Sequence, residues 1–192
     1  ANWMGQIDYE YGQDNGALGN PYIPAVLKNS YVPALYPNTR SSQSASLSLM
    51  QYIDKNTLAK MQFRYVKDDW GVHAQALTLN YAAPLRNPYW HLDSHVRFYR
   101  QSAASFYADN ASQFDEFLSH DPSLAQFEDI ELGMHARIDL SPWFKMDTNK
   151  IYAHMAYAMI FYDYTNYTQM PGSDKLFSFK ANALQSYITV TY

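Results

Sequence analysis

The chain has 192 residues, which is enough for one domain with a hydrophobic core. Its net charge of -4 without basic clusters argues against nucleic-acid binding, and its lack of cysteine excludes disulfides and thiolate metal sites. Charged residues make up 17% of the chain, whereas soluble domains usually carry about 25%. The 18 tyrosines are typical of proteins that place amphipathic rings at two membrane interfaces.

No apolar run is long enough for a membrane-spanning helix, which needs about 20 residues. The apolar run Ala156 to Tyr162 has seven. The sequence shows no signal peptide, because Ala1 leads almost directly into a strand pattern. We expect that the signal has been removed if the protein is exported.

Alternating side chains predict eight β-strands, since successive residues of a strand point to opposite faces. Their lengths exceed the five or six residues common in globular strands. The predicted strands are Trp3–Tyr11, Ser44–Ile53, Leu58–Lys67, Val72–Ala83, Tyr89–Phe98, Phe127–Leu140, Lys150–Tyr164 and Leu176–Tyr192.

The fifth strand shows the alternation most usefully, because one of its faces is apolar and the other ionisable. The apolar set is Trp90, Leu92, Ser94, Val96 and Phe98, and the ionisable set is Tyr89, His91, Asp93, His95, Arg97 and Tyr99. In a soluble sandwich the apolar face would form the core. In a membrane barrel it would meet lipid, and the ionisable face would fill the lumen.

The connections favour the barrel. Long loops at 12–43 and 101–126 and a loop at 165–175 alternate with short turns at 54–57 and 84–88, as external loops and periplasmic turns do in outer-membrane barrels. The turn at 68–71 is short for an external loop, and 141–149 is a further turn. The last strand places Leu184, Ile188, Val190 and Tyr192 on one face, which resembles the signal read by the bacterial barrel-insertion machinery. We therefore predict one domain over 1–192, an all-β antiparallel transmembrane barrel of eight strands with both termini periplasmic.

Several segments, in this order and spacing, resemble the domain-of-unknown-function 3570 family of bacterial outer-membrane proteins. They are Gly19-Asn20-Pro21-Tyr22, Asn38-Thr39-Arg40, the stretch Phe63–Val72 (Phe-Arg-Tyr-Val-Lys-Asp-Asp-Trp-Gly-Val) and the stretch Arg97–Tyr107 (Arg-Phe-Tyr-Arg-Gln-Ser-Ala-Ala-Ser-Phe-Tyr).

The resemblance has consequences for size and context. Family members are about twice this length and carry these motifs in their C-terminal half. The chain is therefore either a half-length barrel or the second half of a larger one of about sixteen strands. The resemblance brings no catalytic residues, and it implies an association with extracytoplasmic flavin-transfer and redox proteins.

The ionisable face predicts a network of paired charges inside the barrel, because buried charges need partners and eight strands leave an interior just filled by side chains. The network comprises Lys60, Arg64, Asp93, Arg97, Asp129, Glu131, Arg137 and Asp139, together with His91, His95, His135 and, at the margin, Lys180.

Two alternative interpretations of this face are a metal or haem site and a hydrolase site. A metal or haem site would use His91 and His95 with His135 from the next strand, because imidazole suits zinc, copper and iron. A hydrolase would need Ser94 or Ser102 to converge with His95 and Asp93, but Ser94 falls on the opposite face and no G-x-S-x-G motif is present. We favour the charge network and expect no catalytic residue, metal or cofactor.

The resulting hypothesis is an integral, porin-like outer-membrane barrel of Gram-negative bacteria without intrinsic catalysis, which acts as a structural, scaffold or transport component. An alternative is a barrel that houses an extracytoplasmic electron-transfer conduit, and a less favoured one is an outer-membrane hydrolase. The expected partners are outer-membrane lipids, lipopolysaccharide and the insertion machinery, and beyond these other envelope proteins or a redox protein.

Overall fold

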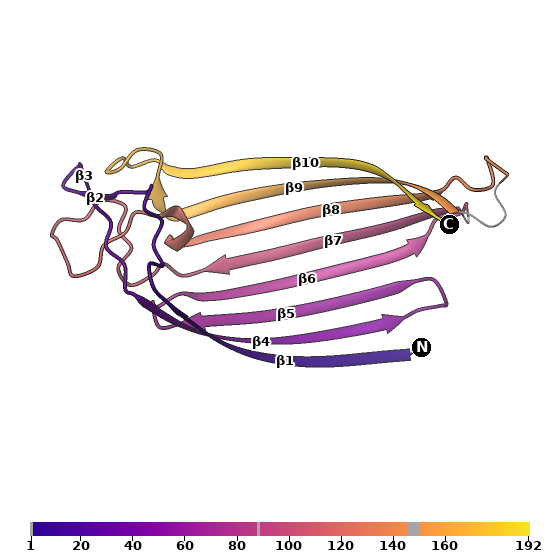
Figure 1. Cartoon of the computed structure of the whole chain (residues 1–192), viewed down its shortest axis with the longest axis horizontal. Coiled ribbons are helices and arrows are strands. Elements are labelled where there is room, and N and C mark those ends of the chain that lie inside the picture. The colour runs from indigo at the N-terminus through magenta and orange to yellow at the C-terminus, as the bar shows by residue number, and fades with distance from the viewer. Residues whose placement is uncertain (1, 88, 146–149) are drawn as a thin grey trace.

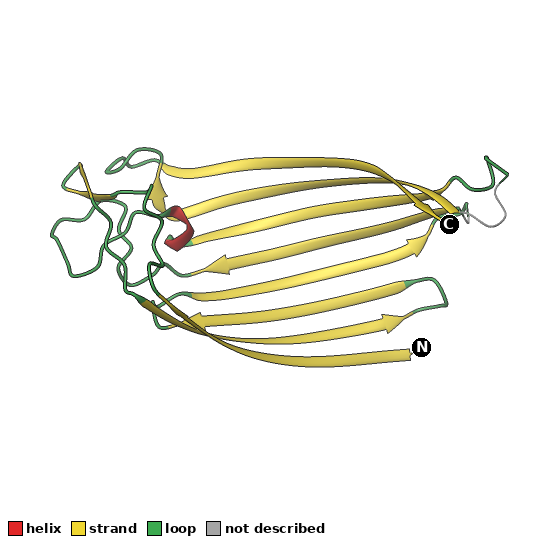
Figure 2. Ribbon diagram, viewed as in Figure 1, coloured by secondary structure: helices red, strands yellow, loops and turns green. Residues whose placement is uncertain are grey.

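The computed structural model describes residues 2–87, 89–145 and 150–192, which form one antiparallel sheet with loops gathered at one end (Figures 1 and 2). The strand order in the sheet is β1-β4-β5-β6-β7-β8-β9-β10, so strands next to one another in the sheet also follow one another along the chain. Their bounds are β1 Asn2–Asn15, β4 Thr39–Tyr52, β5 Leu58–Asp68, β6 His73–Pro84, β7 Trp90–Gln101, β8 Phe127–Asp139, β9 Lys150–Thr168 and β10 Leu176–Thr191. The predicted all-β antiparallel class and its eight long strands are confirmed.

The predicted loop 12–43 was too long. β1 continues to Asn15 and β4 begins at Thr39, because the polar stretch 39–43 pairs with 11–15 and sets Arg40 opposite Asp14. Between them lies a small hairpin of β2 (Ala25–Leu27) and β3 (Ser30–Val32). β9 likewise runs on to Thr168, into the predicted loop 165–175.

The sheet is open, so closure into a barrel, whether of these eight strands or of about sixteen, stays a prediction. Among the described residues β1 pairs with β4 alone and β10 with β9 alone. β1 runs towards the loop end and β10 runs away from it, so the two free edges have opposite directions (Figure 1). Nothing in the sheet itself joins them.

The connections are sorted between the two ends of the sheet as predicted. The segments 16–38, 102–126 and 169–175 gather at one end with the turn 69–72, while the turn 53–57 and the N and C ends lie at the other (Figure 1). The predicted turns 84–88 and 141–149 include residues 88 and 146–149, which lie outside the described residues.

The register gives the sheet one apolar and one polar face. A row of facing residues crosses seven strands as Ile7, Leu47, Phe63, Leu77, Phe98, Ile130 and Phe161. The adjacent row, one residue along each strand, is Gln6, Ser48, Gln62, Thr78, Arg97 and Glu131 before it meets Ile160. We call these the apolar face and the polar face. Many side chains of the apolar face are exposed, among them Ile7 at 81% and Leu184 at 73%.

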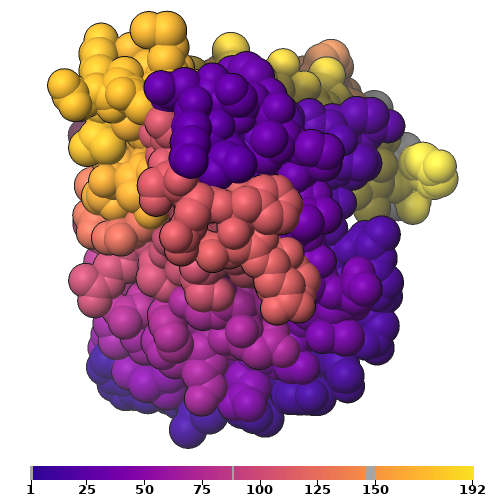
Figure 3. Space-filling model, turned by 90° about the vertical axis from the view of Figure 1, so that its left-hand side faces the viewer, coloured from indigo at the N-terminus to yellow at the C-terminus, as the bar shows by residue number. Residues whose placement is uncertain are grey.

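Much of the close packing lies in the loops rather than on the sheet. Trp70, Val72, Ala104 and Leu124 form a buried cluster, against which Leu18, Tyr36, Phe106 and Tyr107 pack. Loops 16–38 and 102–126 are joined by bridges at Leu27–Ala111 and Leu35–Leu118. Together with 169–175 they cover the end of the sheet (Figure 3), and we call this layer the cap. No helix among the described residues has both the length and the apolar character needed to cross a membrane.

Burial changes the chemistry of tyrosines in the cap. Burial, and then the neighbouring carboxylate of Asp109, raise the pKa of the Tyr107 hydroxyl far above its usual range. The protonated hydroxyl donates to the Asn166 carbonyl at 3.3 Å, and Asp109 accepts from the Thr168 hydroxyl at 2.7 Å. These bonds tie loop 102–126 to the end of β9.

Candidate functional site

An ion-pair cluster lies on the polar face where β7 and β8 run side by side. The Arg97 guanidinium reaches Glu131 at 3.0 Å and Asp129 at 3.0 Å, and its Nε also donates to Glu131 at 3.1 Å. The contact to Asp129 is an ion pair without hydrogen-bond geometry. Because the Asp129 side chain is only 2% exposed, Arg97 is what balances a buried carboxylate. The guanidinium also lies 5.7 Å from the Tyr99 ring centroid.

His95 extends the cluster along β7 and depends on a glycine opposite it. Its Nε2 lies 3.0 Å from Glu131, and its ring lies across the backbone of Gly133, the residue it faces on β8. A Cβ at position 133 would overlap the imidazole. A side chain at position 133 would therefore displace the His95 ring from this position.

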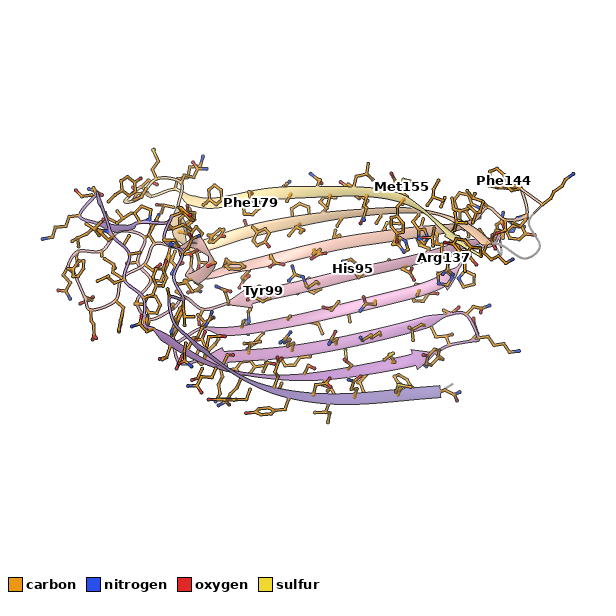
Figure 4. The ribbon with its side chains drawn as sticks, in the orientation of Figure 1. His95, Tyr99, Arg137, Phe144, Met155 and Phe179 are labelled. Carbon is orange, nitrogen blue, oxygen red and sulfur yellow. The ribbon has the colours of Figure 1, made fainter. Side chains whose placement is uncertain are left out.

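A second group of contacts crosses β7, β8, β9 and β10 further from the cap. His135 Nδ1 lies 3.1 Å from Asp93 and its Nε2 lies 3.0 Å from His154 Nδ1. The His154 ring stacks on Tyr187 with centroids 4.3 Å apart. Figure 4 shows the sequence along the sheet: Tyr99 lies nearest the cap, His95 in the middle and Arg137 towards the opposite end.

The remaining residues of the predicted network are Arg64, Arg137, Asp139 and Lys60. Arg64 reaches the exposed Glu10 at 3.4 Å, and the Arg137 guanidinium lies over the Tyr152 ring at 5.3 Å. Asp139 accepts from the Ser141 backbone at 2.9 Å. Lys60 shares the polar face with these side chains, two strands away from Asp93.

The marginal assignment of Lys180 to the polar face was wrong. Lys180 faces Phe161 in the register, so it lies on the apolar face with its amine 5.1 Å from that ring. Alternation along β10 gives the same result, because Lys180 has the parity of Leu184, Ile188 and Val190, and the register from Ser178 onward is continuous.

The three histidines considered for a metal site are not brought together. His91 lies 3.6 Å from Asp93, His95 is paired with Glu131, and His135 contacts Asp93 and His154. Among residues 2–87, 89–145 and 150–192, no group of three or more His, Cys, Asp or Glu side chains is placed around one ion. Ser94 lies on the apolar face and donates to the Tyr81 carbonyl, while Ser102 donates to the Gly71 carbonyl in the cap. Neither serine converges with His95.

Two hollows open on the polar face. One of about 570 Å³ lies beneath the cap, between Arg64 on β5, Tyr99 on β7 and Ser123 above, over the small side chains Ala74 and Ala76 of β6. The other, of about 440 Å³, lies further from the cap and is lined by Lys60, Asp93, His95, His135 and Gln185 among others. Small side chains on β6 and β9 between longer neighbours leave this space open.

The four segments that resemble the family converge beneath the cap. Arg40 Nε donates to Asp68 at 2.8 Å, and the same guanidinium lies 4.7 Å from the Trp70 ring. The Trp70 indole donates to the Thr39 carbonyl at 2.8 Å and packs edge-on against Phe106 at 5.2 Å. Tyr36, whose ring crosses Gly19, lies 6.2 Å from Trp70.

A tight turn holds this arrangement. Asp68 accepts from the Val72 backbone at 2.8 Å, and Gly71 between them has a φ of 89°, which favours glycine. Across the turn, the Ser105 backbone donates to the Trp70 carbonyl at 2.8 Å. The segments are therefore one structural unit that fastens the cap to the sheet.

These four segments fall within a region that matches a known family. A family model described as Protein of unknown function (DUF3570) matches residues 1–172. The chain belongs to this family. No curated protein and no solved structure matches the chain. Membership of the DUF3570 family carries no activity with it, so function has to be argued from the faces of the sheet and its edges.

Sequence reasoning missed four contributors to the polar face: Glu10, Arg40, Asp68 and His154. Glu10 pairs with Arg64 across two strand boundaries, Asp68 with Arg40, and His154 with His135. Parity along each strand would have assigned each residue to a face, but only the register between strands says which residues meet. For His154 the signal was further masked by the aromatic and Met-rich composition of β9.

Proposed function

We propose that this protein is an integral component of the bacterial outer membrane, in which the apolar face meets lipid and the polar face lines the interior of a barrel. The observation that carries the proposal is the exposed apolar row that crosses the sheet from Ile7 to Phe161. A soluble protein rarely leaves a contiguous apolar patch larger than a few hundred Å² uncovered. Strands of 11 to 19 residues are also long enough to cross a bilayer, which takes roughly 9–11 residues.

The open edges of the sheet support a larger barrel than these eight strands alone. Unpaired backbone groups are not tolerated in the hydrocarbon region, so β1 and β10 must each find a partner strand there. The opposite directions of β1 and β10 are compatible with antiparallel closure either directly or through an even number of further strands. A barrel of about sixteen strands would enclose a water-filled channel lined by the polar face.

The role that fits this arrangement is a scaffold or transport component without intrinsic catalysis. Arg97 pairs with Asp129 and Glu131, and Glu131 also contacts His95. Charges that are paired in this way can remain at the wall of a lumen, because each has a partner. The cap closes one end of the sheet, as extracellular loops do in outer-membrane barrels.

Lipid contact is tested by placing a charge on the apolar face. The variant Met134→Arg should weaken refolding into bilayers by about 2–4 kcal/mol, because an arginine near the midplane must leave water. The measurement is urea titration of the chain refolded into lipid vesicles. The control, Gln62→Arg, adds the same side chain to the polar face and should change the midpoint little. Equal effects in the two variants would indicate that the apolar face does not meet lipid.

A further inference from the structure

Two histidines from neighbouring strands share one hydrogen bond on the polar face. His135 Nε2 on β8 and His154 Nδ1 on β9 lie 3.0 Å apart, and the two rings are nearly parallel. A hydrogen bond between two imidazoles needs an N–H group on one ring and a lone pair on the other. We propose that this pair is a pH-sensitive switch, which stays closed with one added proton and opens when a second one binds.

Asp93 determines how the neutral pair is arranged. Its carboxylate lies 3.1 Å from His135 Nδ1 and accepts the proton of that nitrogen. His135 Nε2 then carries a lone pair, so the proton of the shared bond belongs to His154 Nδ1. The other nitrogen, His154 Nε2, is buried and makes no hydrogen bond within the described part of the chain. The neutral pair is therefore complete without a proton on His154 Nε2.

One added proton fits the same geometry. With a proton on both of its nitrogens, His135 donates to Asp93 through Nδ1 and to His154 through Nε2. His154 accepts through Nδ1 once its own proton has moved to Nε2. Because the Asp93 carboxylate balances the new charge, the shared bond survives with its direction reversed.

A second added proton has no place in this geometry. Two N–H groups would face each other across 3.0 Å, and two cationic rings would lie with their centroids 5.2 Å apart. His154 also lies directly opposite Arg137 in the register, while its other neighbour is the stacked ring of Tyr187. Binding of the second proton therefore requires the two histidines to separate.

The charges around the pair add to this effect. The charged and titratable side chains near it are Lys60, His91, Asp93, His95, Arg137, Asp139, Tyr152 and Tyr187. Asp93 is the carboxylate in contact with the pair, and it is shared with His91 at 3.6 Å. His95 is paired with Glu131, and Asp139 accepts from the Ser141 backbone. The surroundings therefore offer no second carboxylate contact for a second cation among the described residues.

Acid would change the polar face towards the end of the sheet opposite the cap, where Arg137 lies (Figure 4). Free imidazoles take up protons near pH 6.5, so the switch should open below about pH 6 and leave positive charge on this part of the face. At the wall of the proposed lumen, such charge would favour anions. This consequence rests on the proposed function, whereas the switch itself lies within β7, β8 and β9 and needs no membrane.

The test follows the shared hydrogen bond by nuclear magnetic resonance of the whole chain, refolded in detergent micelles with isotope-labelled histidine. At about pH 8 we expect a scalar coupling between His135 Nε2 and His154 Nδ1, because the proton between them transmits it, and at about pH 5 we expect none. Persistence of the coupling in acid, or its absence at the higher pH, would overturn the proposal. This measurement needs no variant, so it stays decisive if a substitution prevents folding.

Stability provides a second readout with a matched control. The folded chain opposes the second proton and the unfolded chain accepts it, so acid should weaken the fold. Between about pH 8 and pH 5, the unfolding constant of the unaltered chain should rise at least about tenfold more than that of His154→Gln, whose amide takes up no proton. His73→Gln removes a histidine of the apolar face beside Tyr65 and should respond like the unaltered chain.

Equal acid responses of the unaltered chain and a folded His154→Gln would contradict the switch. A switch that opens in micelles and yet leaves the ion selectivity in planar bilayers independent of pH would support the pair and count against the proposed lumen.

Discussion

At the scale of single residues, Arg97 joins the acidic side chains of the ion-pair cluster between β7 and β8. It is paired with Asp129 and Glu131 at once, and Glu131 in turn holds His95. Arg64, two strands away, has the same chemistry but reaches only the exposed Glu10, at 3.4 Å. The two arginines therefore differ in burial of their partners rather than in type.

This contrast gives a matched pair of variants. Arg97→Ala should lower the free energy of unfolding by about 3 kcal/mol, because it leaves the buried Asp129 carboxylate without a balancing cation. Arg64→Ala should cost at most about 1 kcal/mol, as exposed ion pairs usually do. Urea unfolding followed by tryptophan fluorescence measures both. Equal losses would mean that the charges near Arg97 are solvated rather than paired.

Gly133 and Lys180 show that the type of a residue does not by itself determine its structural role or the face on which it lies. Gly133 matters because the His95 ring crosses it. Lys180 does not belong to the polar network, because it lies on the apolar face opposite Phe161.

At the scale of elements, the turn after β5 and the start of loop 102–126 act together. Trp70 contacts Phe106, the Thr39 carbonyl and the Arg40 guanidinium. The cap thereby receives an aromatic core of its own, although its chain segments are distant in sequence. The eight strands contribute little to this core.

The contribution of this core to the stability of the protein can be measured by substituting two tryptophans in turn. Trp70→Ala should cost about 3–5 kcal/mol, because it opens a cavity in the buried cluster, and it should make loop 102–126 more sensitive to protease. The exposed stretch 112–116 is where we expect cleavage. Trp143→Ala removes a tryptophan that is 64% exposed and should change neither quantity. Unchanged proteolysis in Trp70→Ala would show that the loops hold themselves without the cluster.

At the scale of the whole molecule, the two open edges decide what the polar face can do. Eight strands closed on themselves would pack their charged side chains together and leave little space. With further strands between β1 and β10, the same charges would line water. In either case the proposed function places the exposed apolar face against lipid.

Conduction distinguishes the two arrangements. Reconstituted in planar bilayers, the larger barrel should give a steady, large conductance, and Arg97→Glu should shift its selectivity towards cations because it reverses a charge on the channel wall. Arg100→Glu, which changes the apolar face beside Gln75, should leave the selectivity as it was. The absence of any stable pore would instead favour closure of the eight strands on themselves.

The eight long strands and most of their faces could be predicted from the sequence, because alternation along a strand depends only on the order of its residues. The stretch from Trp90 to Tyr99 shows this best, since each of its residues lies on the predicted face. The same holds for Arg97, Asp129 and Glu131 as members of one network. Family membership also followed from short motifs in their order along the chain.

Only the tertiary structure decided which residues of a face meet and where the chain packs densely. The contacts of His135 with His154 and of Arg40 with Asp68 depend on the register between strands, which alternation leaves undetermined. The open edges of β1 and β10 and the core of the cap depend on backbone pairing and loop packing between distant segments. Such contacts are set by the free energy of the whole fold and not by any local stretch of sequence.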